Sequence, residues 1–449
     1  MRILRRILVV AAVFVVVATA VGTGVYRWQR PMILTGTGYA AHNDCAVTEI
    51  GGRLDAASDL PANPIKSYLR YGSDGSAETT GSLLGVLAKQ KAWYAKGFGC
   101  TLADARPRLG PASTVSADGN PFTHAPAPKS SAKLDAALGR AFGKGLSASD
   151  AAALGTRAVV VVKDGKLVAE RYAKGFDATT PQLGWSMSKS ATALITGMLV
   201  QQGKVTLDDH GLRPEWKKDG RADITVEQLL RMTSGLEWDE TYDLGTPITQ
   251  MLYGESDMGA YVAGRPAEHK PGTVQEYSSG STTLLCSVLA QRTGLGADLP
   301  RQTLFRALGL SSAVLEPDAA GTPVCSSYLW ATPRDWATIG QFALQNGKWH
   351  GKQLLPEDWM KRSLEVEPVD KTDDPGYGMT WRVNVLPDGS MRWPELPKDT
   401  YYASGHDGQK VIVVPSQDLV VVRMGFTPDA DDEASEVALV EEVIGAGVR

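Results

Sequence analysis

A serine and a lysine one helical turn apart are the first candidates for chemistry in this sequence. Ser186 and Lys189 form a Ser-x-x-Lys motif, and the residues after it have apolar positions spaced as on a helix with one buried face. Ser186 is therefore expected at the start of that helix, with Lys189 on the same side. A lysine held neutral there can take the proton of the serine hydroxyl and make it a nucleophile. The Ser186 amide, at the helix end, could donate to an oxyanion.

The same spacing occurs a second time, in Ser130-Ser131-Ala132-Lys133. That copy lies in a Pro- and Ser-rich stretch with no strand before it, where a helix-capping serine and a solvated lysine are the usual outcome. Ser186, in contrast, lies between an expected strand pair and a long amphipathic helix. Only Ser186 is therefore expected to be held rigidly.

Two later segments carry residues that could complete such a site. Tyr277 opens Tyr-Ser-Ser, which ends at Ser279, and a tyrosine near a lysine can act as a phenolate base and later return its proton to the leaving group. The third segment is Gly405-His406-Asp407-Gly408-Gln409, which leads directly into an expected strand. Glycines at a strand edge let a substrate approach backbone amides, so His406 is expected to face the site.

The elements that must position these residues are strands at both ends of a helical middle. Residues 158–162 and 167–172 predict one hairpin, and residues 410–414 and 419–422 predict another, while 187–370 is mostly helical in pattern. Residues 433–444 have the spacing of a closing helix. We expect an α/β protein of the α+β type, in which an antiparallel sheet is flanked by helices with a helical subdomain beside it.

The N-terminus carries an export signal. Arg2, Arg5 and Arg6 precede an apolar run from Ile7 to about Tyr26, long enough to cross a bilayer. The run exceeds what a signal peptide needs, which favours an uncleaved anchor over cleavage after Ala-Thr-Ala at 18–20. The upstream arginines place the body outside the cytoplasm. The expected location is the inner membrane with a periplasmic or extracellular body, or the periplasm if the signal is cleaved.

The expected domains are residues 1–31 as anchor or signal peptide, 32–135 as an N-terminal extension with a Pro/Ser-rich linker, and 136–449 as the main domain. A helix is expected near Ser82–Tyr94, and a loop over 105–131. Export permits disulfides, and Cys45 with Cys100 is the first expected pair. For Cys286, a buried free thiol and a bridge to Cys325 both remain open.

Composition narrows the function. The 449 residues carry a net charge of −4, and the first 31 hold five arginines and no acid, so residues 32–449 carry −9 and have no basic excess to bind nucleic acid phosphates. Six dispersed histidines show no His-x-x-x-His pair, which argues against a zinc hydrolase, and we expect no metal or cofactor. Ser186 lies in Gly-x-Ser-x-Ser, which also disfavours an α/β-hydrolase. The composition does not indicate an oligomeric state.

The three motifs in this order resemble the serine β-lactamase and penicillin-binding-protein superfamily, and most of all class C β-lactamases, related esterases and 6-aminohexanoate-dimer hydrolases. The resemblance covers about residues 150–449 and implies a β-lactamase/transpeptidase-like fold. It implies that Ser186 is acylated, that Lys189 and Tyr277 share the acid and base work, and that Ser279 and the His406–Gly408 turn bind substrate. It further implies that the amides of Ser186 and Gln409 hold the oxyanion and that Tyr242 contacts substrate.

Two departures from the family pattern concern the substrate. Ser279 replaces the usual Asn, and His406 replaces a Lys that would pair with a carboxylate. We expect an exported serine hydrolase for a small ester or linear amide. The alternatives are a β-lactamase or a penicillin-binding-protein-like peptidase, for which Arg423 could supply the cation, and a membrane-tethered binding module without turnover.

Overall fold

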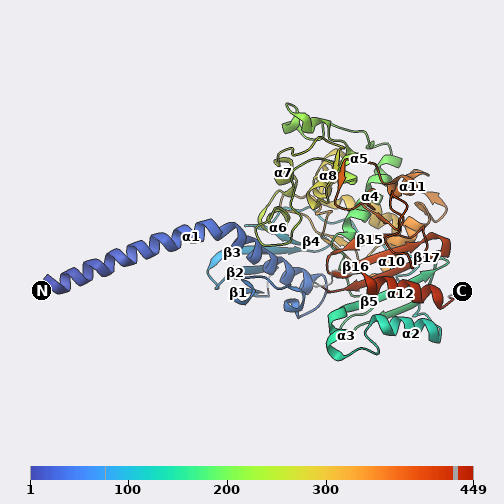
Figure 1. Ribbon diagram of the computed structural model, residues 1–449, viewed down its shortest axis with the longest axis horizontal. Coiled ribbons are helices and arrows are strands. Elements are labelled where there is room, and N and C mark those ends of the chain that lie inside the picture. Colours follow the sequence, from blue (N-terminus) through green and yellow to red (C-terminus); the bar gives the residue numbers. More distant parts are fainter. Residues whose placement is uncertain (1, 76, 428–432, 448–449) are drawn as a thin grey trace.

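The computed structural model describes residues 2–75, 77–427 and 433–447. Strands from residues 156–172 and from residues 382–425 form one antiparallel sheet, helices cover both of its faces, and a largely helical part lies beside it (Figure 1). The predicted α+β class, with an antiparallel sheet and a helical subdomain, is confirmed.

The main sheet has six strands that are antiparallel throughout. In spatial order they are β14 (Arg382–Val383), β15 (Tyr401–Gly405), β16 (Gln409–Val414), β17 (Leu419–Gly425), β5 (Thr156–Lys163) and β6 (Lys166–Tyr172). Both predicted hairpins, β5–β6 and β16–β17, are confirmed. The β5–β6 turn uses Asp164 and Gly165, both at positive φ, which suits a two-residue hairpin.

Two cores explain why β5 is an unbroken apolar run. Val160 and Val162 join the core that contains α10 (Pro333–Leu344), whereas Val159 and Val161 join the core beneath α2 and α12. Successive side chains of a strand face opposite sides of the sheet, so a strand covered on both faces needs apolar residues at every position. The covering helices on the second face are α2 (Ala132–Ala141) and α12 (Ala434–Gly445).

The prediction that residues 187–370 form a mostly helical part is confirmed. After α3 (Ala148–Leu154), its helices are α4 (Met187–Gln201), α5 (Val226–Leu230), α6 (Pro247–Gly254), α7 (Met258–Ala263), α8 (Ser279–Thr293), α9 (Arg306–Leu308) and α11 (Trp359–Leu364). Short strands connect them: β7 (Gln182–Leu183), β8 (Val274–Gln275), β9 (Val314–Leu315), β10 (Leu329–Ala331), β11 (Lys348–Trp349), β12 (Lys352–Gln353) and β13 (Lys371–Thr372).

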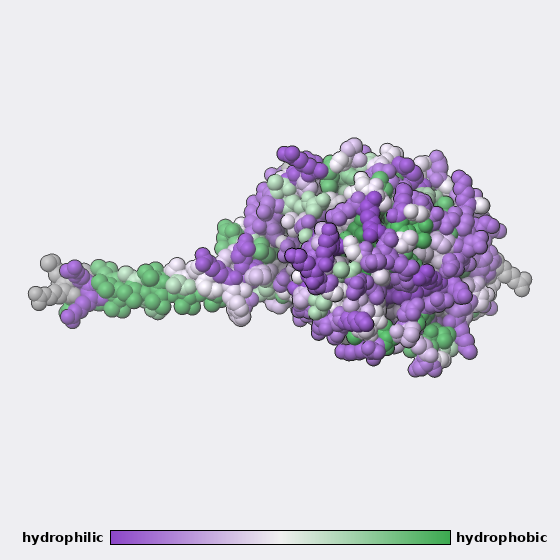
Figure 2. All heavy atoms as spheres, turned by 90° about the horizontal axis from the view of Figure 1, so that it is seen from above, coloured by the Kyte–Doolittle hydropathy of each residue, from purple (hydrophilic) through white to green (hydrophobic). Residues whose placement is uncertain are grey.

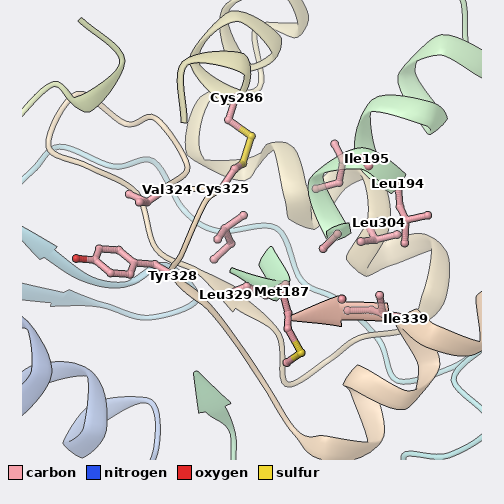
Figure 3. Close-up of a cluster of buried hydrophobic side chains, with 14 of the residues drawn as sticks. Met187, Leu194, Ile195, Cys286, Leu304, Val324, Cys325, Tyr328, Leu329 and Ile339 are labelled. Atoms are coloured by element: carbon pink, nitrogen blue, oxygen red, sulfur yellow. A yellow bond between two sulfur atoms is a disulfide. The ribbon is translucent and has the colours of Figure 1, made fainter. Parts of the chain in front are cut away.

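A disulfide answers the question left open for Cys286. It bridges Cys325 and ties α8 to the segment before β10. Figure 3 shows this bridge in the buried cluster that also holds Met187, Leu194 and Ile195 of α4. The bridge therefore lies in the same core as the helix that starts at Ser186.

The first helix, α1 (Arg2–Glu49), is longer than the predicted anchor and passes through Pro31. Side chains of its first half are exposed, whereas almost all of residues 33–47 are buried. Figure 2 shows the apolar first half projecting from the body. It is the one helix in the described residues that is long and apolar enough to cross a membrane. The same helix thus has an exposed apolar part and a part inside the protein.

The buried half of α1 lies between α6 and a four-stranded antiparallel sheet. The strands are β1 (Leu69–Ser73), β2 (Glu78–Leu83), β3 (Leu87–Ala95) and β4 (Gly99–Leu102). Glycines allow this close packing: a Cβ on Gly38 would lie 2.2 Å from the Tyr253 carbonyl oxygen, and one on Gly81 would lie 2.2 Å from that of Thr37. The predicted Cys45–Cys100 disulfide is confirmed and joins α1 to β4.

The helix predicted near Ser82–Tyr94 is wrong, because this segment forms parts of β2 and β3. Leu83, Leu84, Val86 and Leu87 have helix-like spacing, but Leu84 and Gly85 adopt φ of 54° and 83°. Two successive residues at positive φ form a hairpin turn and cannot continue a right-handed helix. The predicted loop over 105–131 contains no helix or strand. Whether residues 31 and 135 are domain boundaries remains a prediction.

Candidate active site

Ser186 lies at the foot of α4, where the backbone is tightly constrained. Gly184 donates its amide to the Leu329 carbonyl, and a Cβ on Gly184 would lie 2.1 Å from the Trp336 ring. Trp185 follows at a φ of 48°, and Ser186 then takes the N-cap position of α4. The Ser186 hydroxyl caps no amide of its own helix, so it is not occupied as a structural cap. The helix behind it is buried from Met187 to Leu199.

Lys189 is buried one turn into α4 and points back to Ser186. Its Nζ donates to the Ser186 Oγ at 2.9 Å and to the Ser279 Oγ at 2.8 Å. A third hydrogen bond, 3.1 Å long, goes to the Ser326 carbonyl. The side chain is 1% exposed, so these three oxygens replace water around the amine. The lysine is therefore held in one position beside the serine.

The ring of Tyr277 lies beside the Lys189 amine, and among the described residues its phenol makes no hydrogen bond to Lys189 or Ser186. The Lys189 Nζ lies 4.7 Å from the centroid of the Tyr277 ring, and the Arg382 guanidinium carbon lies 5.1 Å from the same centroid. The Tyr277 amide donates to Asp373, which fixes the backbone just before α8. The structure thus brings together three residues that are far apart in the chain and that the sequence singled out.

Glu240 is a site residue that the sequence reasoning missed. It accepts hydrogen bonds from the Ser279 hydroxyl and from the Ser279 amide, the latter at 2.8 Å. The Trp238 indole donates to the same carboxylate at 2.6 Å. Because Ser279 also accepts from Lys189, a hydrogen-bonded chain runs from Glu240 through Ser279 and Lys189 to Ser186. Its position two residues before Tyr242 was the available signal.

Arg382 is a second missed residue, and no motif marks it. It lies on β14, a strand of two residues, and binds Asp374 at 2.6 Å. Burial opposes the charge of Arg382, but Asp374 raises its pKa above the ordinary value of an arginine. Arg382 therefore stays charged beside the Tyr277 ring, where a cation stabilises a developing phenolate.

The His406 turn meets the start of α4 through backbone contact. A Cβ on Gly405 would lie 2.1 Å from the Gly184 carbonyl oxygen, so only glycine allows this approach. His406 follows, with its ring stacked on Tyr242 at 4.5 Å and edge-on to Trp185 at 5.7 Å. Burial raises the pKa of Tyr242 well above its ordinary range, and Glu240 adds to the effect, so this phenol stays neutral. His406 and Tyr242 therefore form one wall against Trp185, the residue before Ser186.

Gly408 and the Gln409 side chain hold the turn in shape. Gly408 has a φ of 81°. The Gln409 Nε2 donates to the Gly425 carbonyl at 2.7 Å, and its Oε1 accepts from the Gly425 amide at 2.9 Å. The side chain of Gln409 is thus structural, and only its backbone amide remains a candidate for the oxyanion.

Arg423 is not placed to receive a carboxylate. Its side chain is 4% exposed and donates to the Gly408 carbonyl at 2.7 Å and to Thr427 at 2.8 Å. It also binds the Leu154 carbonyl. The arginine suggested as a substitute cation is instead a support for the Gly408 turn.

The second Ser-x-x-Lys behaves as the sequence context predicts. Ser131 is the N-cap of α2 and accepts from the Leu134 amide, while Lys133 is exposed. In the described part of the chain, one group could share a metal ion, formed by Glu268, His269 and Glu276. It contains none of the residues that meet at Ser186.

An aromatic path links the site to α1. Trp185 lies edge-on to Tyr39 of α1 at 6.4 Å, and Tyr39 stacks on Tyr253 at 4.4 Å. Tyr39 is 7% exposed. No motif in the sequence indicated that residues before 136 would pack against the residue that precedes Ser186.

Comparison with known proteins identifies the family of the chain. The profile of the Beta-lactamase family matches residues 147–442, so the chain belongs to that family. The chain is 24% identical over 296 residues to the 6-aminohexanoate-dimer hydrolase of Paenarthrobacter ureafaciens, which covers 62% of this chain and 74% of that protein.

Solved structures show the same fold. A Bacillus anthracis protein provisionally described as a 6-aminohexanoate-dimer hydrolase has a TM-score of 0.58 and 24% identity, over 73% of this chain and 89% of its own. A family VIII carboxylesterase has a TM-score of 0.51 and 16% identity, over 70% of this chain and 96% of its own. The predicted resemblance to the β-lactamase and penicillin-binding-protein superfamily is confirmed, and the chain is a hydrolase of the β-lactamase fold.

Proposed function

We propose that the chain is an exported, membrane-anchored serine hydrolase that cleaves a small ester or a linear amide through an acyl-enzyme on Ser186. The observation that carries this proposal is the buried Lys189 amine, 2.9 Å from the Ser186 Oγ and beside the Tyr277 ring. The stability of α4 does not require a buried lysine that points at a serine with no capping hydrogen bond. Burying an amine also costs free energy unless the amine is hydrogen-bonded or has a function.

The proposed reaction begins when Tyr277, assisted by Lys189, removes the proton of Ser186. The serine oxygen attacks the substrate carbonyl, and the amides of Ser186 and Gln409 stabilise the oxyanion. The carbon–oxygen or carbon–nitrogen bond then breaks, and the leaving group takes the proton from the Lys189–Tyr277 pair. Water attacks the acyl-enzyme by the reverse relay and releases the acid.

The surroundings of Ser279 and His406 support a substrate without a strong carboxylate anchor. Ser279 is engaged by Lys189 and Glu240 and offers no side-chain amide of the kind an Asn would provide. Arg423 is used by backbone carbonyls, and Lys410 is engaged by Ser404 and Glu433. Among the described residues at this turn, neither Arg423 nor Lys410 is left to pair with an anionic β-lactam or peptide terminus, which favours neutral small substrates.

Anchoring by α1 completes the proposal. The exposed apolar half of the helix is flanked by arginines on both sides, and the arginines before it favour a cytoplasmic N-terminus. Both disulfides lie after the apolar stretch, in the part that would then be outside, where they persist.

A fluorophosphonate probe tests the chemistry. We expect labelling at Ser186, located by peptide mass spectrometry, and its loss in Lys189→Ala. No labelling of a folded wild-type chain would instead favour a binding module. Intact mass after exposure to p-nitrophenyl esters, linear amides and nitrocefin would then identify the acyl group, and preferential acylation by nitrocefin would overturn the proposed substrate class.

A further inference from the structure

The tip of the β2–β3 hairpin exposes apolar side chains outside α1. Leu84 is 57%, Val86 is 78% and Leu87 is 38% exposed. Tyr68, 55% exposed, lies beside them, because the Leu84 amide donates to the Tyr68 carbonyl at 2.9 Å. Single exposed apolar residues are ordinary, but a turn in which successive apolar side chains face solvent is a candidate contact surface.

This tip lies at one end of the N-terminal unit, residues 33–102, where α1 enters the protein. The Thr37 hydroxyl donates to the Ala88 carbonyl at 2.8 Å, and Cys45 further along α1 is bridged to Cys100 on β4. Residue 94, which pairs with Cys100, is therefore near residue 45, while residue 88 is near residue 37. Going back along β3 from Ala88 to Val86 thus leads toward the exposed, apolar half of α1. Figure 2 shows hydrophobic surface on the body where the projecting helix meets it.

The polar residues near the tip have the signs that a lipid surface attracts. Residues 66–73 and 79–91 contain four basic residues and no acid. Of these, Arg70 and Lys89 are exposed close to the apolar side chains. Tyrosine beside aliphatic side chains and lysine or arginine is the composition found at membrane interfaces. On α1 itself, Trp28 is 78% exposed and lies between Arg27 and Arg30.

We propose that the hairpin tip, formed by Leu84, Val86, Leu87 and Tyr68, is a second membrane contact that inserts into the interface of the same bilayer that α1 crosses. The inference rests on the proposed anchoring by α1. With two contacts, the helix and the hairpin, the body cannot tilt freely relative to the bilayer, whereas one helix alone would allow it to tilt. The loop of Tyr242 lies at this end too, because a Cβ on Gly245 would lie 3.3 Å from the Met32 Cβ. The hairpin would therefore fix the catalytic wall at a set height above the bilayer.

Fluorescence quenching in vesicles tests this contact. The full-length chain is reconstituted into phosphatidylglycerol–phosphatidylethanolamine vesicles, with or without lipids brominated on the acyl chains. We expect the emission that Val86→Trp adds to the wild-type spectrum to fall by roughly half or more with brominated lipid, because bromine quenches only groups that reach the acyl region. Leu84→Trp, on the other side of the turn, should behave alike.

Leu54→Trp is the matched control. Leu54 belongs to the same unit and is 97% exposed, but it follows the far end of α1, about 24 Å along the axis from residue 33 by helical rise. Quenching at position 86 no greater than at position 54 would overturn the proposal, as would a hairpin shielded by a second copy. Flotation of wild-type chain with the vesicles reports separately on α1, and ester turnover reports separately on the active site.

Discussion

The N-terminal unit, residues 33–102, and the hydrolase body, residues 147–442, differ in how much of their role the sequence motifs reveal. The body holds every residue that meets at Ser186 and matches a family profile. The unit holds no chemical motif, yet Tyr39, Leu60 and Leu69 belong to the same buried cluster as Met187 of α4. The difference teaches that a segment without a catalytic signature can still form part of the wall behind the candidate nucleophile.

The largest effect should come from the body. Lys189→Ala is expected to lower kcat/KM on a p-nitrophenyl ester by about 10⁴-fold, roughly 5.5 kcal/mol, because it removes the amine that contacts Ser186. Lys133→Ala changes the other Ser-x-x-Lys and should leave kcat/KM within about twofold, since surface changes rarely matter. Equal effects of the two variants would contradict the assignment of the site to α4.

Removing each disulfide in turn compares how the two regions contribute to the free energy of unfolding. The bridges close loops with sequence separations of 55 and 39 residues. Replacing either pair by serines should lower the free energy of unfolding by about 4 kcal/mol in the loop-entropy picture. We expect chemical denaturation to show a single transition for Cys45→Ser/Cys100→Ser, as for Cys286→Ser/Cys325→Ser. Early separate melting of the N-terminal unit would show that it is an independent domain.

The contact between the body and the loop that follows the N-terminal unit should respond to pH. Asp335 of α10 accepts from Asn120, in the loop over 103–131, at 2.6 Å, and burial raises the pKa of Asp335 to about 6. A raised carboxyl pKa means that the folded state binds the proton more tightly, so this stabilisation is present below about pH 4 and is lost as pH rises to 6.

The expected loss is about 3 kcal/mol between these pH values. Urea denaturation of wild type and Asp335→Asn across pH 4 to 7 measures it, because the difference between them isolates Asp335. A difference that is constant with pH would contradict the raised pKa.

Substitution of Glu240 tests whether the loop of Tyr242 contributes to catalysis as well as to the shape of the site. Glu240→Gln keeps the size but weakens the bonds to Ser279, and should lower kcat/KM by about ten- to a hundredfold, the value of a hydrogen bond to a charged group. Glu237→Gln is the control, because Glu237 lies on the same loop as Glu240 but pairs with Arg265. If the Glu240 carboxylate acts through Lys189, the pH–rate profile of Glu240→Gln should differ from that of the wild type, whereas the profile of Glu237→Gln should match it.

The smallest effect tests the wall directly. Tyr39→Leu removes the stacking on Tyr253 and the edge contact with Trp185, and should cost about 1 kcal/mol of stability. Some of that loss should appear as a lower kcat, because Trp185 precedes Ser186. Tyr68→Leu, an exposed tyrosine of the same unit, should change neither quantity in detergent. An unchanged kcat in Tyr39→Leu would show that the unit supports the fold alone.

Local signals predicted the body well. Unbroken apolar runs, which reflect burial on both faces, predicted β5 and β16, and the spacing after Ser186 predicted α4, because both patterns lie within a few successive residues. The helix predicted near Ser82–Tyr94 was wrong, because the apolar residues at the exposed tip of the β2–β3 hairpin have the spacing of a helix. Arg382 could not be predicted, because a two-residue strand has no periodicity.

The sequence by itself determined the family, because Ser-x-x-Lys, the Tyr-Ser-Ser segment and the His-Asp-Gly turn are local patterns along the chain. Only the tertiary structure decided what surrounds them: that Glu240 binds Ser279, that Arg423 is consumed by backbone carbonyls and that α1 packs behind Trp185. These contacts join residues 15 to 269 positions apart, and long-range packing is set by the complementarity of whole surfaces, which no spacing along one segment encodes.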